Sequence, residues 1–68
     1  MNAIIINASR DVYRASDAAE HTMTVEDLRY FLDQFDDKTP VILSFDGGYT
    51  YGKIREERIE EAELNSEE

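Results

Sequence analysis

Carboxylates are the side chains best placed to do chemistry in this chain, and they occur as adjacent pairs at Asp36-Asp37, Glu56-Glu57 and Glu60-Glu61. Two carboxylates can act as general acid and general base in glycoside hydrolysis, but only when they flank a cleft that holds the sugar. A chain of 68 residues has little room for such a cleft. We therefore interpret the acidic pairs as a solvated surface and expect no catalytic residue among them.

Other catalytic and metal-binding chemistries lack their usual components. His21 would be the only imidazole, the serines stand in no nucleophile-elbow motif, and the absence of cysteine excludes disulfides and thiolate metal sites. Four aspartates near predicted loops could supply oxygen ligands to calcium, namely Asp33, Asp36, Asp37 and Asp46. Their order is not that of an EF-hand loop. We predict a protein that is not an enzyme and that uses no cofactor and no metal.

Two features could suggest phosphate or nucleic-acid binding. Asp46-Gly47-Gly48 is rich in glycine, but it lacks the lysine, the helix start and the further glycines of a phosphate-binding loop, and a hairpin turn explains it. The seven basic residues are scattered and are outnumbered by 16 acidic ones, whereas neutralising phosphates requires clustered lysine and arginine. We therefore expect no direct contact with nucleic acid.

The excess of acid instead predicts recognition of a positively charged protein. The formal charge is −9, and residues 55–68 hold seven glutamates against two arginines. A small domain with this charge can occupy the basic channel through which another protein binds DNA, with its carboxylates paired to arginine and lysine. The predicted partner-binding acids form two clusters, one of Glu56, Glu57, Glu60, Glu61 and Glu63 and one of Asp33, Asp36 and Asp37.

Apolar surface offers a second means of binding. Ile4, Ile6, Tyr49 and Tyr51 could lie at a sheet edge that pairs with another chain, either in a homodimer or by strand addition. Packing in the core is the alternative for each of these four side chains. In this interpretation the acidity serves only to keep the protein soluble.

The clearest element to position these groups is a helix over residues 25–35. Thr24 is placed to cap it, with Asp27 completing a capping box. The apolar residues then recur with helical spacing on one face, at Val25, Leu28, Phe31, Leu32 and Phe35. Asp36 to Pro40 should end the helix, because proline restricts the residue before it to extended conformations.

Strand signals lie on both sides of this helix. Residues 41–54 are predicted to form a hairpin that turns at Asp46-Gly47-Gly48, with Gly52 marking a bulge or a close approach of the backbone. Three successive isoleucines favour a strand over Ala3 to Ile6 that is covered on both faces or contacts another chain. The weaker segments are Val12–Arg14 as a strand, residues 16–21 as a loop or one loose helical turn, and residues 58–60 as a strand or a frayed helix.

These elements predict an α+β fold in which one amphipathic helix packs on a small antiparallel sheet that contains a β-hairpin. The expected core is Phe31, Leu32, Phe35, Val41, Leu43 and Phe45. Residues 1–64 are predicted to form one domain, followed by a disordered acidic tail at residues 65–68. Because the early apolar run, Ala3 to Ile6, is far too short to cross a bilayer, we expect a soluble, cytoplasmic protein.

The central block resembles a group of small uncharacterised proteins of bacteria and their mobile elements. The likeness rests on Thr24-Val25-Glu26-Asp27-Leu28, on Asp36-Asp37-Lys38-Thr39-Pro40-Val41, and on Gly47-Gly48-Tyr49-Thr50-Tyr51-Gly52, and it covers about residues 20–60. The resemblance implies an origin in a bacterium, a phage or other mobile DNA. Small acidic phage proteins include anti-CRISPR proteins and DNA mimics that block restriction.

Charge and resemblance together predict a non-enzymatic, acidic protein-binding module. Its partner would be a host defence nuclease whose basic nucleic-acid-binding surface it blocks, in the manner of an anti-CRISPR protein that mimics DNA. The alternative is a small oligomeric accessory or structural protein, including a homodimer, whose acidity only maintains solubility. Neither function involves a membrane.

Overall fold

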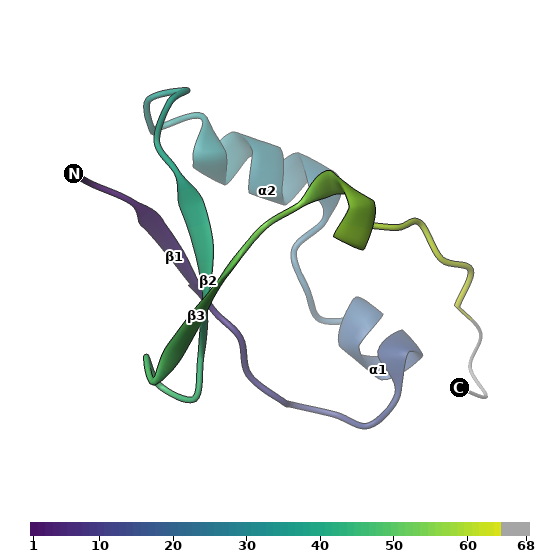
Figure 1. The fold of residues 1–68 in the computed structure, drawn as a ribbon. Helices are drawn as coiled ribbons and strands as arrows, with labels where there is room; N and C mark the ends of the chain where they lie inside the picture. Colours follow the sequence, from purple (N-terminus) through teal and green to yellow (C-terminus); the bar gives the residue numbers. More distant parts are fainter. Residues whose placement is uncertain (65–68) are drawn as a thin grey trace. The chain divides into compact units, whose positions relative to one another are not determined.

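The structure is a computed structural model that describes residues 1–64, so the predicted tail at residues 65–68 lies outside the described residues. The chain divides into two compact units. Residues 1–10 and 38–62 form the sheet unit, and residues 11–37 belong to the helical unit together with Glu63 and Leu64. An α+β composition is confirmed, since a three-stranded sheet and α-helices are both present (Figure 1).

The sheet unit contains β1 (Ile4–Asn7), β2 (Val41–Phe45) and β3 (Thr50–Lys53), in the order β1-β2-β3. The two strands of the predicted hairpin, β2 and β3, pair antiparallel as expected. The prediction of an antiparallel sheet is correct for this pair and wrong for β1, which runs parallel to β2. A parallel pair needs a long crossover connection, and residues 8–40, with two helices among them, supply it.

The hairpin turn depends on backbone conformations that favour glycine. Asp46, Gly47 and Gly48 all have positive φ angles, of 53°, 66° and 96°. The amides of Gly48 and Tyr49 donate to the carbonyl oxygen of Phe45, at 3.1 and 3.0 Å, and close the turn. The prediction that the hairpin turns at these three residues is therefore confirmed.

Gly52 lies where an aromatic ring comes close to the backbone of the strand, and no bulge interrupts the strand there. The pairing of β2 with β3 is continuous, with Leu43 opposite Gly52 and Phe45 opposite Thr50. A Cβ atom on Gly52 would lie only 3.2 Å from Cε2 of Phe45, so the glycine makes room for this aromatic ring. The close neighbour is thus a side chain and not a backbone.

The register gives the sheet one apolar face. Paired residues point to the same side, which groups the side chains of Ile4, Ile6, Val41, Leu43 and Phe45 into what we call the apolar sheet face. Yet Ser44, at 3% exposure, is the only buried residue among residues 1–64. Taken by itself, the sheet unit is a single layer, and one layer alone cannot enclose a hydrophobic core.

The predicted core residues are therefore not buried. Its three phenylalanines, Phe31, Phe35 and Phe45, each remain about 40% exposed, and its aliphatic members are only partly covered. The aliphatic members are Leu32, Val41 and Leu43. No apolar side chain within residues 1–64 is buried.

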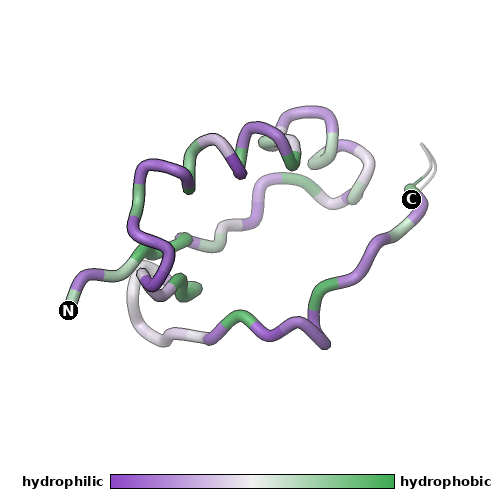
Figure 2. The backbone as a smooth tube through the Cα atoms, turned by 90° about the horizontal axis from the view of Figure 1, so that it is seen from above, coloured by the Kyte–Doolittle hydropathy of each residue, from purple (hydrophilic) through white to green (hydrophobic). Residues whose placement is uncertain are grey.

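The helical unit contains α1 (Ala15–Ala19) and α2 (Val25–Leu32). The strand expected at Val12–Arg14 is absent, since a single exposed Val-Tyr pair offers too little apolar surface for a strand. A short helix forms after it, where the sequence favoured a loop or one helical turn. Arg14 contacts Asp17 across the start of α1, with 3.4 Å between Nε and Oδ2. Hydrophilic residues recur along this part of the chain (Figure 2).

The capping box of α2 is confirmed in both directions. The Asp27 amide donates to Oγ1 of Thr24, and the Thr24 amide donates to Oδ2 of Asp27, each at 3.1 Å. The helix ends at Leu32, three residues before the predicted end. There the Gln34 side chain donates from Nε2 to the carbonyl oxygen of Phe31, at 3.0 Å, and so satisfies one of the carbonyls that a helix end leaves free.

Phe35, beyond α2, nevertheless stays close to the helix. Its amide donates to the carbonyl oxygen of Leu32 at 3.1 Å, and its ring meets that of Phe31 edge-on with 5.5 Å between centroids. Farther along the chain, Glu56–Arg58 form a single 3-10 turn. Of the two alternatives predicted for residues 58–60, a strand or a frayed helix, the strand does not form. The 3-10 turn reaches Arg58, and residues 59–64 contain no regular element.

Replacing the N-cap threonine should weaken α2 selectively. Thr24→Ala removes the hydroxyl that accepts from the Asp27 amide, and loss of an N-cap of this kind costs about 1 kcal/mol. We expect the free energy of unfolding, measured by urea titration with circular dichroism at one fixed protein concentration, to fall by about this amount. Thr22→Ala, at the threonine just outside the capping box, is the matched control and should have little effect. Equal losses in the two variants would contradict the role of the cap.

Candidate functional site

The surplus negative charge is unevenly divided between the two units. Residues 11–37 hold eight acidic residues against two arginines, a formal charge of −6. In the sheet unit five acidic residues are matched by five basic ones, so that unit is formally neutral. The charge that could attract a basic partner is therefore concentrated in the helical unit.

The second predicted acidic cluster lies at the carboxyl end of α2. Asp33 is the C-cap residue of the helix, and Asp36 and Asp37 follow within four residues, all three of them exposed. The carboxyl end of a helix carries the negative end of its dipole, so a carboxylate there adds to the negative potential instead of cancelling it. This arrangement is unfavourable for the isolated helix and favourable for attraction of a cation.

The first predicted cluster is divided. Glu56 and Glu57 lie in the 3-10 turn, and Glu60 and Glu61 follow it in an extended stretch of the sheet unit, whereas Glu63 falls in the helical unit. All five are exposed. Two arginines, at positions 55 and 58, interrupt the run and reduce the local charge. These glutamates therefore form a weaker negative surface than their number suggests.

The two tyrosines of the predicted interface are both open to solvent. Tyr51 lies on β3, at an edge of the sheet as expected, whereas Tyr49 lies in the turn before that strand. Their exposures of 84% and 60% exclude the alternative that they pack in a core. Both remain available to a partner.

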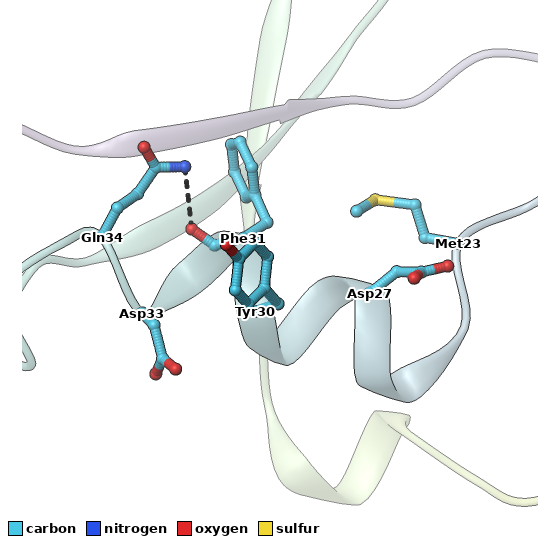
Figure 3. Close-up of a pocket in the computed structure, with 6 residues that line it drawn as sticks. All are labelled: Met23, Asp27, Tyr30, Phe31, Asp33 and Gln34. Atoms are coloured by element: carbon cyan, nitrogen blue, oxygen red, sulfur yellow. Dashed lines mark hydrogen bonds between the residues drawn. The ribbon is translucent and has the colours of Figure 1, made fainter.

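A groove on the helical unit brings apolar, aromatic and acidic side chains together. It is not among the features predicted from the sequence. It has a volume of about 680 Å³ and is lined by Met23, Asp27, Tyr30, Phe31, Asp33 and Gln34 (Figure 3). Figure 3 shows the Met23 and Phe31 side chains on the same side of α2. Helical spacing signals only part of this groove, because Asp27 and Tyr30 share a face of α2 whereas Met23 precedes the helix and Gln34 follows it.

The groove suits the side chain of an arginine or a lysine. Thioether and phenyl groups can cover an aliphatic stem, while the carboxylates of Asp27 and Asp33 and the face of the Tyr30 ring attract the cationic end. The Asp27 carboxylate is held in place by its bond to the Thr24 amide. Every residue that lines the groove is exposed, so it is an open surface depression.

A second depression lies in the sheet unit, where β1 and β2 end. It has a volume of about 490 Å³, and its lining includes Ser9, Arg10, Asp46 and Gly47. The guanidinium of Arg10 and the carboxylate of Asp46 have opposite charges, so this depression favours neither an anion nor a cation. It gives no support to phosphate binding at the glycine turn.

Within residues 1–64, no three histidine, cysteine, aspartate or glutamate side chains are grouped so that they could hold a metal ion. None of the helices in that part of the chain is long and apolar enough to cross a membrane. Comparisons of the chain with protein-family models, with curated proteins and with solved structures found no match.

Chemical modification can test the exposure of the interface tyrosines. All four tyrosines are exposed in the folded chain, so tetranitromethane should nitrate Tyr49 and Tyr51 as readily as Tyr13 and Tyr30. Peptide mass spectrometry would measure the rate at each site, with the urea-unfolded chain as the reference. A tyrosine at position 49 or 51 that reacts only after unfolding would contradict the described surface.

Proposed function

We propose that the protein is a non-enzymatic, acidic protein-binding module that covers a basic nucleic-acid-binding surface of another protein. In this proposal it is an inhibitor carried by a phage or other mobile element, acting on a host defence nuclease in the manner of a DNA-mimicking anti-CRISPR protein. Such a target implies a cytoplasmic location. The observation that carries the proposal is the concentration of negative charge in residues 11–37.

The charge along α2 has the sign that a DNA-binding surface meets, at a lower density than that of duplex DNA. Five carboxylates, against the single cation of Arg29, lie on α2 and in the five residues after it. An α-helix rises about 1.5 Å per residue, so Glu26 and Asp33 lie about 10 Å apart along the axis. Duplex DNA presents one negative charge per about 1.7 Å of axis. A basic channel built for DNA is therefore a complementary partner for this helix.

The groove beside α2 supports a specific contact in addition to general attraction. Long-range attraction between opposite charges speeds association but is screened over about 8 Å at physiological salt. A partner arginine inserted between Met23 and Phe31 would pair with Asp27 or Asp33 while its stem covers apolar surface. Charge would bring the partner close, and the groove would fix the position of one of its side chains.

A second candidate function rests on a different observation. No apolar side chain within residues 1–64 is buried, which favours an oligomeric accessory or structural protein whose exposed apolar surface meets other copies. In that case the acidity only maintains solubility. The packing of the helix on the sheet, predicted from the sequence, stays a prediction under both functions.

Charge-reversal variants distinguish the effect of the acidic surface of the helical unit on inhibition from the effect of the net charge of the protein. We expect the protein to inhibit DNA cleavage by at least one member of a panel of purified bacterial defence nucleases, more strongly at low salt than at high salt. The double variant Asp33→Lys with Asp37→Lys should weaken this inhibition about 100-fold or more, because removing one partner of a close charge pair costs about 2 to 5 kcal/mol.

The matched control is Glu57→Lys with Glu60→Lys, which changes the net charge equally but within the neutral sheet unit. It should weaken inhibition far less. Equal losses of inhibition in the two double variants would show that only the net charge matters and would contradict a role for the acidic surface of the helical unit. Absence of inhibition across the panel at low salt, or inhibition that is indifferent to salt, would contradict the proposed function.

A further inference from the structure

The first strand of the sheet has an open edge. β1 is the outer strand of the order β1-β2-β3 and pairs with β2 along one side only. Within β1, Ile5 and Ile6 are exposed. Of the two alternatives predicted for this strand, cover on both faces is therefore wrong, and contact with another chain stays a prediction. An edge strand rich in isoleucine is a template for pairing with another strand.

The hydrogen bonds of β1 identify which backbone groups are open. The Ile4 amide donates to the carbonyl oxygen of Pro40, and the Ala8 amide donates to that of Ser44, each at 2.9 Å. Backbone groups of successive strand residues alternate in direction, so residues 4, 6 and 8 face β2. The amide and carbonyl groups of Ile5 and Asn7 therefore point away from the sheet.

This edge lacks the devices with which proteins protect an exposed strand. Native edges are usually blocked by a charged side chain, a proline or a bulge. Residues 2–9 contain no charge and no proline, and the pairing of β1 with β2 is continuous. The edge is thus both available for pairing and free of any group that would oppose it.

Charge indicates what can cover the edge. The sheet unit is formally neutral, and the strand itself is uncharged, so two copies can meet here without repulsion between them. A strand with no charge is also complementary to itself, because no like charges face each other across a two-fold axis. Nothing in this strand favours a charged foreign segment over a second copy.

We propose that β1 pairs antiparallel with β1 of a second copy of this chain, which joins two three-stranded sheets into one of six strands. The two-fold axis passes beside Ile6. Ile5 and Asn7 of one copy then exchange backbone hydrogen bonds with Asn7 and Ile5 of the other, and the Ile6 side chains face each other. The apolar sheet faces of the two copies lie on the same side and become continuous. This dimer stands independently of the proposed function.

A backbone substitution tests this edge directly. Ile5→Pro removes the outward amide and leaves the bonds of Ile4 and Ala8 to β2 in place, and proline is tolerated at a strand edge where its nitrogen faces away from the sheet. Ile5→Thr keeps the amide and a β-branched side chain, so it is the matched control. In sedimentation equilibrium we expect a dimer for the wild type and for Ile5→Thr, and a monomer with unchanged β-sheet circular dichroism for Ile5→Pro.

Two results would overturn the proposal. A wild-type chain that stays monomeric at millimolar concentration would leave the edge for a strand of some other protein, and a dimeric Ile5→Pro variant would place the interface elsewhere.

If the Ile5→Pro variant loses its β-sheet, cross-linking of a cysteine variant tests the proposed interface instead. The chain has no native cysteine, so Ile6→Cys introduces a single thiol beside the proposed axis. Facing residues of a pair without direct hydrogen bonds lie close enough for a disulfide. Ile6→Cys should therefore form a cross-linked dimer under mild oxidation, whereas Tyr51→Cys, on the opposite edge strand, should not. Cross-linking of Tyr51→Cys alone, or of neither variant, would overturn the proposal.

Discussion

The apolar surface left open to water is the constraint on which the rest of this structure depends. Within residues 1–64 only Ser44, on the central strand of the sheet, is buried, while phenylalanines of both units and several isoleucines of the sheet unit remain exposed. Fully burying one such side chain contributes about 1.5 to 3 kcal/mol, and partial burial contributes less. A small sheet needs a covered hydrophobic face to be stable. In both proposals association adds contacts to these units, in the dimer through backbone hydrogen bonds at β1 and with a basic partner through the acidic helical unit.

Under the two proposals, the division of charge gives the two units different partners. The helical unit carries a formal charge of −6 over residues 11–37 and a groove suited to a cationic side chain, so it fits a basic protein surface. The sheet unit is neutral and has an uncharged edge strand, so it fits a second copy of itself. A dimer joined at β1 would present two acidic helical units to one target, which raises the effective concentration of the second contact.

Local signals were predictable from the sequence, whereas distant relations were not. The capping box at Thr24 and the glycine turn after Phe45 follow from neighbouring residues, and both are present. The parallel direction of β1 depends on the path of the whole connection, which no local pattern encodes. The end of α2 was misplaced because the Gln34 side chain takes a free carbonyl where hydrophobic spacing alone would continue the helix. The groove does not follow from these local signals, because the sequence pattern of Phe31 indicates core, that of Asp27 a helix cap and that of Asp33 an acidic cluster.

Under the proposed dimer, part of the stability of this fold comes from association. The most direct test is the midpoint of thermal unfolding, followed by circular dichroism over about a hundredfold range of protein concentration, since stability coupled to association depends on concentration. The account predicts that the midpoint rises steadily as the concentration increases. A cooperative transition with the same midpoint at every concentration, from a chain that is monomeric throughout, would contradict it.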